Sequence, residues 1–234
     1  MEPVQELIQQ HKTYFYGTAF FYAFLITFTV FISIMGLAAI IYGLGTSPIL
    51  WILLPLPIYA SIQFSNGAFL FTVTYLSALI LEHKEVSLQD ARYIALSFFI
   101  EIIKLPAFVI RRRDTLRRYL SYPHAVFSDK KIFSAYEDTK TFKKAIGGQY
   151  AYYNIPFIAS FILLTGMLFL AVYLLPLQPY ILFGSILSYT FITSFLWFYF
   201  KTPHIIQRTA LYIYAKAGRI LSPFTFDDLK KVIS

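Results

Sequence analysis

The chain has 234 residues, of which 58% are hydrophobic, 20% aromatic and 14% charged, and its formal net charge is +8. Because an average soluble domain carries about 25% charged residues, this composition excludes an ordinary soluble domain and indicates an integral membrane protein. The absence of cysteine excludes a disulfide, a thiolate metal site, an iron–sulfur cluster and a cysteine nucleophile.

The charged residues are confined to three stretches that two uncharged blocks separate. Residues 13–81 and 145–200, which are 69 and 56 residues long, contain no Asp, Glu, Lys or Arg. Residues 82–144 hold 13 of the 20 Lys and Arg residues and 8 of the 12 Asp and Glu residues. A helix needs about 20 apolar residues to cross a hydrocarbon core of about 30 Å, so we expect two crossings in each block.

The first block predicts a surface helix followed by a membrane hairpin. Residues 3–13 have an amphipathic pattern that is typical of a short helix. We expect no cleavable signal peptide, because the first residues are acidic where a signal would be basic. The first crossing is expected at 14–42. The second is expected at 58–81, because Pro55 and Pro57 should kink or end the helix before it.

The second crossing contains the most polar cluster within any expected span. Small and amide side chains commonly bridge neighbouring helices in lipid, and we prefer this interpretation to the alternative of contact with a substrate. The candidate intramembrane contacts are Gln63, Ser65 and Asn66, with Ser61 nearby.

Residues 93–110 form an apolar stretch of 18 residues with two interpretations. Ser97, Glu101 and Lys104 share one helical face within it. The stretch either crosses the membrane with an intramembrane ion pair or lies in the interface with its polar face toward water. We favour the interface, because a crossing would put the arginines at 111–118 on the opposite side from the polar stretch before it.

The rest of the central segment predicts two helix starts, and the second helix is expected on the membrane surface or against another cytoplasmic helix. Ser87 is expected to cap the first of them, with Asp90 at the capping-box position. Residues 119–127 are expected to be a connector that contains Pro123. Ser128 is then expected to cap an amphipathic helix that ends at Gly147 and the glycine after it.

The second uncharged block predicts the third and fourth crossings, at 150–175 and 180–200. Thr202, as a cap, and Pro203, at the first helical position, should start a separate interfacial helix over 204–217. The tail predicts only a short helix near its end.

The positions of Lys and Arg predict the topology. The turns at 43–48 and 176–179 contain no charge, and Lys and Arg mark the cytoplasmic side. We therefore expect an all-α, multi-pass protein of the cell membrane with both termini and residues 83–147 in the cytoplasm. We expect a single membrane domain in four parts, namely 1–82 with the first hairpin, 83–147, 148–200 with the second hairpin, and 201–234.

The candidate binding residues form an arginine run in the central segment. Juxtamembrane cations attract anionic lipid head groups at about 1 kcal/mol each, and this is the interpretation that we prefer. An acidic partner protein or a phosphorylated ligand is the alternative, and nucleic acid is not expected, because no recognition fold surrounds the run. These candidates are Arg111, Arg112, Arg113, Arg117 and Arg118.

Residues with catalytic chemistry are few, and we identify none as catalytic. Folding could gather histidines into a metal or acid–base site, but no pair has ligand spacing such as H-x-x-x-H. There is no phosphate loop, dinucleotide fingerprint or nucleophile elbow, and the expected spans contain no ionisable acid, base or His. We therefore expect no metal and no cofactor. The histidines are His11, His83, His124 and His204.

Two short motifs resemble a group of uncharacterised prokaryotic polytopic membrane proteins over about residues 60–160. The first motif is Phe-Ser-Asn-Gly-Ala at 64–68, and the second is Tyr-Pro-His-Ala-Val-Phe-Ser-Asp at 122–129. The resemblance implies a membrane protein of unknown function and no catalytic residue. This chain departs from that group, whose members usually have more crossings between the two motifs.

Two functional hypotheses follow from these observations. The first is a non-catalytic scaffold or accessory subunit of a membrane assembly, which associates with other membrane subunits or with itself. The second is a membrane enzyme or carrier that acts on a lipid or another apolar solute.

Overall fold

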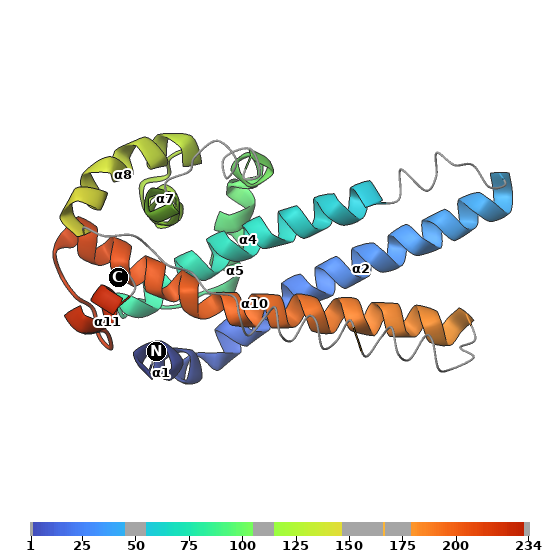
Figure 1. Ribbon diagram of the computed structural model, residues 1–234, viewed down its shortest axis with the longest axis horizontal. Coiled ribbons are helices and arrows are strands. Elements are labelled where there is room, and N and C mark those ends of the chain that lie inside the picture. Colours follow the sequence, from blue (N-terminus) through green and yellow to red (C-terminus); the bar gives the residue numbers. More distant parts are fainter. Residues whose placement is uncertain (1, 45–54, 105–114, 147–165, 167–178, 232–234) are drawn as a thin grey trace. The chain divides into compact units, whose positions relative to one another are not determined.

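The computed structural model describes residues 2–44, 55–104, 115–146, 166 and 179–231 (Figure 1). Within these residues all regular structure is helical, which confirms the predicted all-α class. The helices are α1 (Glu2–Gln10), α2 (Lys12–Leu44), α4 (Pro55–Leu81), α5 (Leu88–Ser97), α7 (Thr115–Ser128), α8 (Ile132–Ile146), α10 (Pro179–Ala217) and α11 (Phe226–Lys231).

Three of these helices contain stretches that are long and apolar enough to cross a membrane. The stretches are Lys12–Ile40 in α2, Leu56–Leu81 in α4 and Ile181–Ala217 in α10. They overlap the first, second and fourth expected crossings, and the stretch in α10 extends past the expected end at residue 200, which supports a multi-pass membrane protein. The expected third crossing, at 150–175, lies almost wholly outside the described residues.

The chain divides into two compact units. The charged unit comprises Met1–Thr18, Gly67–Tyr153 and Lys201–Ser234, and the uncharged unit comprises Ala19–Asn66 and Asn154–Phe200. The uncharged unit contains no Asp, Glu, Lys or Arg. The helices α2, α4 and α10 each contribute residues to both units.

Aromatic side chains join α2 to α10 within the uncharged unit. Aromatic pairs of this kind add to the stabilisation that apolar burial provides. Other aromatic rings, such as those of Phe24 and Phe28, are exposed on α2, as expected for a surface that faces hydrocarbon. The joining pairs are Phe20–Phe191, Tyr22–Phe198 and Phe31–Phe183, with ring centroids 5.2, 6.2 and 5.8 Å apart.

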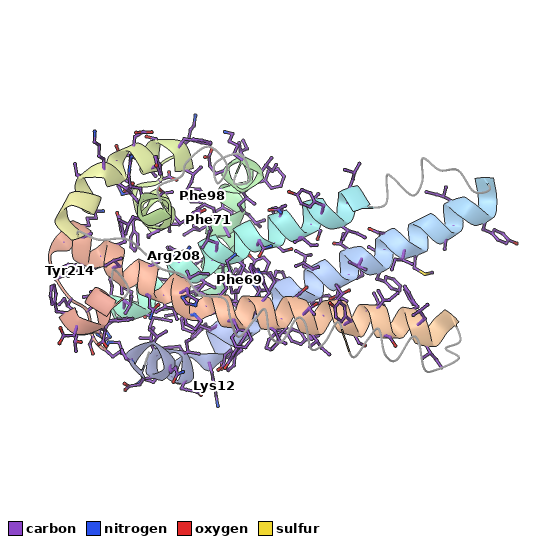
Figure 2. All side chains as sticks on the ribbon, in the orientation of Figure 1. Lys12, Phe69, Phe71, Phe98, Arg208 and Tyr214 are labelled. Atoms are coloured by element: carbon purple, nitrogen blue, oxygen red, sulfur yellow. The ribbon has the colours of Figure 1, made fainter. Side chains whose placement is uncertain are left out.

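The core of the charged unit forms around the last turns of α4. Phe69 and Phe71 are fully buried there, and the Phe71 ring stacks on Phe98 with a centroid distance of 4.7 Å (Figure 2). The Tyr122 ring of α7 meets the Phe71 ring edge-on at 6.5 Å. The predicted amphipathic helix at the N-terminus is present as α1, which buries Val4 and its other apolar residues.

The helix α5 begins with the cap that the sequence predicts. The Ser87 side chain accepts a hydrogen bond from the backbone N–H of Asp90 at 3.2 Å, so the predicted cap is confirmed. The helix turns at Phe98, and residues 99–104 are helical again. The polar face expected within 93–110 therefore lies partly on this second piece, whereas residues 105–110 lie outside the described part of the chain.

The predicted connector at 119–127 is wrong. These residues belong to α7, which is helical from Thr115 to Ser128 with Pro123 inside it. A proline in a helix interior costs about 3 kcal/mol because it removes a backbone hydrogen bond. Leu120 and Ala125 on either side of it are fully buried, and we attribute the continued helix to their packing.

Two other predicted boundaries also differ. Ser128 ends α7 and does not cap the next helix, because α8 begins only at Ile132. The separate helix expected after Thr202 does not exist, since α10 continues through Pro203 to Ala217. Gly218 ends α10 with a φ of 65°, a conformation that glycine adopts without a steric penalty.

Candidate functional site

Three helices of the charged unit direct polar side chains into one cluster. His124 and Ser128 lie four residues apart on α7 and so share one face of that helix. Asp138 comes from α8, and Tyr212 comes from the last part of α10. We call these four residues the His124 cluster.

Both nitrogens of the His124 ring have hydrogen-bonding neighbours. Nδ1 lies 2.9 Å from the Tyr212 hydroxyl and 3.2 Å from Ser128 Oγ, and Nε2 lies 3.3 Å from Asp138 Oδ2. These neighbours fit a neutral imidazole whose Nε2–H donates to the carboxylate while the Tyr212 hydroxyl donates to Nδ1. Lys130 Nζ donates to the same carboxylate oxygen at 2.7 Å.

Burial and charge keep the cluster in this protonation state at neutral pH. His124 is only 7% exposed, and its burial lowers the pKa of the ring although the Asp138 charge acts in the opposite direction. The pKa of Asp138 is lowered by its hydrogen bonds with Lys130 and His124. An ionised carboxylate thus orients a neutral imidazole.

In this cluster a carboxylate contacts an imidazole, which in turn contacts a hydroxyl. Serine hydrolases use the same sequence of groups to orient their general base. Here, however, the hydroxyl of Tyr212 belongs to a side chain that is 1% exposed, and the ring is enclosed by three helices. The geometry therefore links α7, α8 and α10 to one another. Catalysis would require this cluster to open toward a substrate.

Glu101 makes a second polar link in the charged unit. Its carboxylate accepts a hydrogen bond from the backbone N–H of Ile132 at 2.9 Å and another from Lys104 Nζ at 3.2 Å. The first bond satisfies a donor at the N-terminus of α8, where a negative charge is also favoured by the helix dipole. The Glu101–Lys104 pair that we considered for a membrane crossing thus lies in the charged unit.

Of the candidate arginines, the structure describes the side chain of Arg117 alone. Its guanidinium donates to the backbone carbonyl of Tyr136 at 2.8 Å, lies 3.4 Å from Glu137 and sits 4.1 Å above the Tyr136 ring. Arg117 therefore joins α7 to α8. The other candidates lie outside the described residues, or have side chains that do, and these are Arg111, Arg112, Arg113 and Arg118.

The candidate intramembrane residues belong to the uncharged unit. Asn66 Oδ1 accepts a hydrogen bond from Trp197 Nε1 at 2.6 Å, and neighbouring Ser61 donates to Thr29 at 3.0 Å. Ser65 is buried and Gln63 half-buried on α4. A functional contact at Gln63 or Ser65 stays a prediction.

The other three histidines do not join the His124 cluster. His83 is exposed just after α4, whereas His11 and His204 are half-buried in the N-terminal part of the chain and in α10. Among the described residues, no three His, Asp or Glu side chains are grouped so that they could hold a metal ion.

The sequence shows His124 only as one of four scattered histidines. The structure brings Asp138 and Tyr212 to its ring. Tyr212 is 88 residues away, and no local pattern marks it. Asp138 is one of several charged positions on the polar side of α8, so the pattern does not single it out.

The chain matches no protein-family model, no curated protein and no solved structure. The resemblance to polytopic membrane proteins over residues 60–160 therefore stays a prediction.

Proposed function

We propose that this chain is a non-catalytic, multi-pass membrane protein that serves as a scaffold or accessory subunit of a membrane assembly. The observation that carries this proposal is the use of polar side chains in the charged unit. Glu101, Arg117 and His124 each contact a helix other than their own. Such contacts stabilise a fixed set of surfaces, which is what a scaffold requires.

The surface of the uncharged unit supports the same proposal. Large apolar side chains on α2 are exposed there, among them Phe20, Phe24 and Phe28. Membrane helices associate through close packing and a few interhelical hydrogen bonds, and α2 offers aromatic rings to a neighbouring subunit. We propose that other membrane subunits or a second copy of the chain pack on this helix.

We further propose four spans in two hairpins, with the charged unit in the cytoplasm. The charged unit gathers α1, the central helices and the end of α10. An even number of spans brings these three parts of the chain to one side of the membrane, whereas five spans would separate the tail from the N-terminus. The positive-inside rule then supports the cytoplasmic side.

Photo-crosslinking in native membranes tests the accessory role. A photoreactive amino acid at Phe28 is expected to form a defined adduct with another membrane protein or with a second copy of the chain. The same amino acid at exposed Glu85 in the charged unit is the matched control. If position 28 forms adducts with lipid alone, and mild extraction yields a monomer without a partner, the proposal is wrong.

A membrane enzyme acting on a lipid is the second candidate, and the order of groups in the His124 cluster favours it. His124→Gln and Tyr212→Phe test this candidate. On our proposal both variants unfold at lower temperature, and the membrane lipid composition stays constant when protein amounts are equal. A changed lipid composition at unchanged stability would favour the enzyme.

A further inference from the structure

The helical pieces at 88–104 are apolar on two opposite faces. One face buries Ala95, Phe98 and Ile102 in the charged unit. The other face carries side chains that are at least half exposed, and we call these side chains the apolar ridge. The ridge consists of Tyr93, Leu96, Phe99, Ile100 and Ile103, which are 73%, 56%, 50%, 63% and 61% exposed.

The ridge is held firmly by its buried face. Phe98 stacks on Phe71 of α4, and Glu101 accepts a hydrogen bond from the backbone of Ile132 in α8. Both contacts are to helices of the same compact unit. The exposed side chains are therefore presented on a fixed support, so their exposure does not arise from a loosely attached segment.

The ridge lies close in the chain to a candidate membrane span. The apolar stretch of α4 ends at Leu81, and only residues 82–87 separate it from the start of α5. Residues of α4 from Gly67 onward belong to the charged unit, which we place in the cytoplasm, so the span of α4 would meet the membrane surface near Gly67. Phe71, on which Phe98 stacks, lies about one turn beyond that point.

Positive charges occur at both ends of the ridge. Lys84 precedes it and Lys104 follows it, and their side chains are 61% and 45% exposed although they pair with Glu82 at 2.6 Å and Glu101 at 3.2 Å. In the sequence, three consecutive arginines follow at 111–113. An apolar face flanked by cations is typical of helices that lie in the interface and bind anionic lipids.

We propose that the 88–104 helical pieces lie in the head-group layer, with the apolar ridge inserted at the acyl boundary and Lys84 and Lys104 on anionic head groups. The occupant of the exposed face is thus the bilayer. This inference does not depend on the accessory role, because it follows from the ridge, its support and the charges beside it.

Fluorescence quenching in vesicles tests where the ridge lies. The chain has no cysteine, so single cysteines at Ile100 or Ile103 can carry an environment-sensitive dye in the full-length protein. Exposed Gln89 on α5 is the matched control. We expect lipid-borne nitroxides to quench the dye at 100 and 103 several-fold more than at 89, and iodide to show the reverse order.

Two results would overturn the insertion. If iodide reaches position 100 as readily as position 89, the ridge faces water. If neither quencher reaches position 100, and a crosslinker there captures a second copy or another protein, the ridge is covered by protein. Circular dichroism of each labelled variant establishes that the helical content is retained.

The binding of Lys84 and Lys104 to anionic head groups is tested separately. Adding phosphatidylglycerol to phosphatidylcholine vesicles should increase lipid quenching at position 100. Lys84→Gln combined with Lys104→Gln should remove this increase, while Lys140→Gln on the exposed face of α8 should retain it. An increase that persists in the double variant, or that is absent from the unsubstituted chain, would contradict anionic-lipid binding.

Discussion

Single polar residues in the charged unit act at long range along the chain. Glu101 satisfies a backbone donor at Ile132, and Arg117 donates to the backbone carbonyl of Tyr136, which also accepts from Thr139. A buried backbone group that loses its partner costs more than the hydrogen bond contributes, because it was already removed from water. Removing one such side chain should therefore lower the free energy of unfolding by more than the energy of one hydrogen bond.

Glu101→Ala is expected to lower the free energy of unfolding by about 1–3 kcal/mol, because the buried N–H of Ile132 then lacks its acceptor. Glu85→Ala, at an exposed position outside any helix, should change it by less than about 0.5 kcal/mol. Thermal unfolding of both variants in the same detergent compares the two effects. Equal melting temperatures for the two variants would contradict the capping role.

His124 should make the stability of the charged unit fall on acidification. Its folded pKa is lowered from 6.5, so the unfolded chain binds the proton more tightly. The contribution of the neutral ring to the free energy of unfolding is complete above pH 6.5, and it declines as the pH falls from 6.5 toward the folded pKa. The groups that act on the ring are Asp138, Lys130, Lys216, Tyr212 and Ser128.

His124→Gln is accordingly expected to reduce the loss of melting temperature between neutral and mildly acidic pH. His83→Gln is the control, since His83 is exposed. Asp138, whose pKa is lowered from 3.8, contributes in the same direction but only at more acidic pH. A pH profile that is identical in His124→Gln and in the unsubstituted chain would show that this ring does not carry the dependence.

At the scale of elements, local rules predicted the cap at Ser87 but not the extents of α7 and α10. Ser87 caps α5 as predicted, because the cap and its donor are three residues apart. Pro123 was expected in a connector and Pro203 at the first position of a separate helix, yet α7 and α10 continue through them. Packing against other helices can outweigh a weak local preference, and nothing local to a proline shows how its neighbours will be buried.

Pro203→Ala tests how much α10 loses at its interior proline. The alanine N–H can donate to the carbonyl of Tyr199 one turn earlier, so the variant should be more stable by about 1–3 kcal/mol. Pro57→Ala is the matched control, because Pro57 lies in the first turn of α4, where backbone N–H groups have no partner within the helix. A loss of stability in Pro203→Ala would indicate that α10 needs the proline.

For the molecule as a whole, charge distribution predicted the three candidate spans of the described residues but not the two units. The uncharged blocks overlap the apolar stretches of α2, α4 and α10, and the α10 stretch continues past its block to Ala217. The 39 residues of α10 extend about 58 Å, nearly twice the hydrocarbon thickness. The sequence shows that charged residues resume at Lys201. A charged residue at this position is compatible both with the end of α10 and with its continuation into the charged unit, so the sequence alone did not predict the continuation.

Accessibility of single cysteines tests the proposed four spans. In intact cells, an impermeant maleimide should label cysteines that replace Thr46 and Gln178, because both lie in the uncharged turns that we assign to the outside. Cysteines in place of His83 and Lys216 should react only after permeabilisation, since the charged unit contains both positions. Ala23, which is fully buried, is the control that should stay unlabelled. Labelling of 83 and 216 from opposite sides would require an odd number of crossings between them, and the charged unit could not then lie on one side of the membrane.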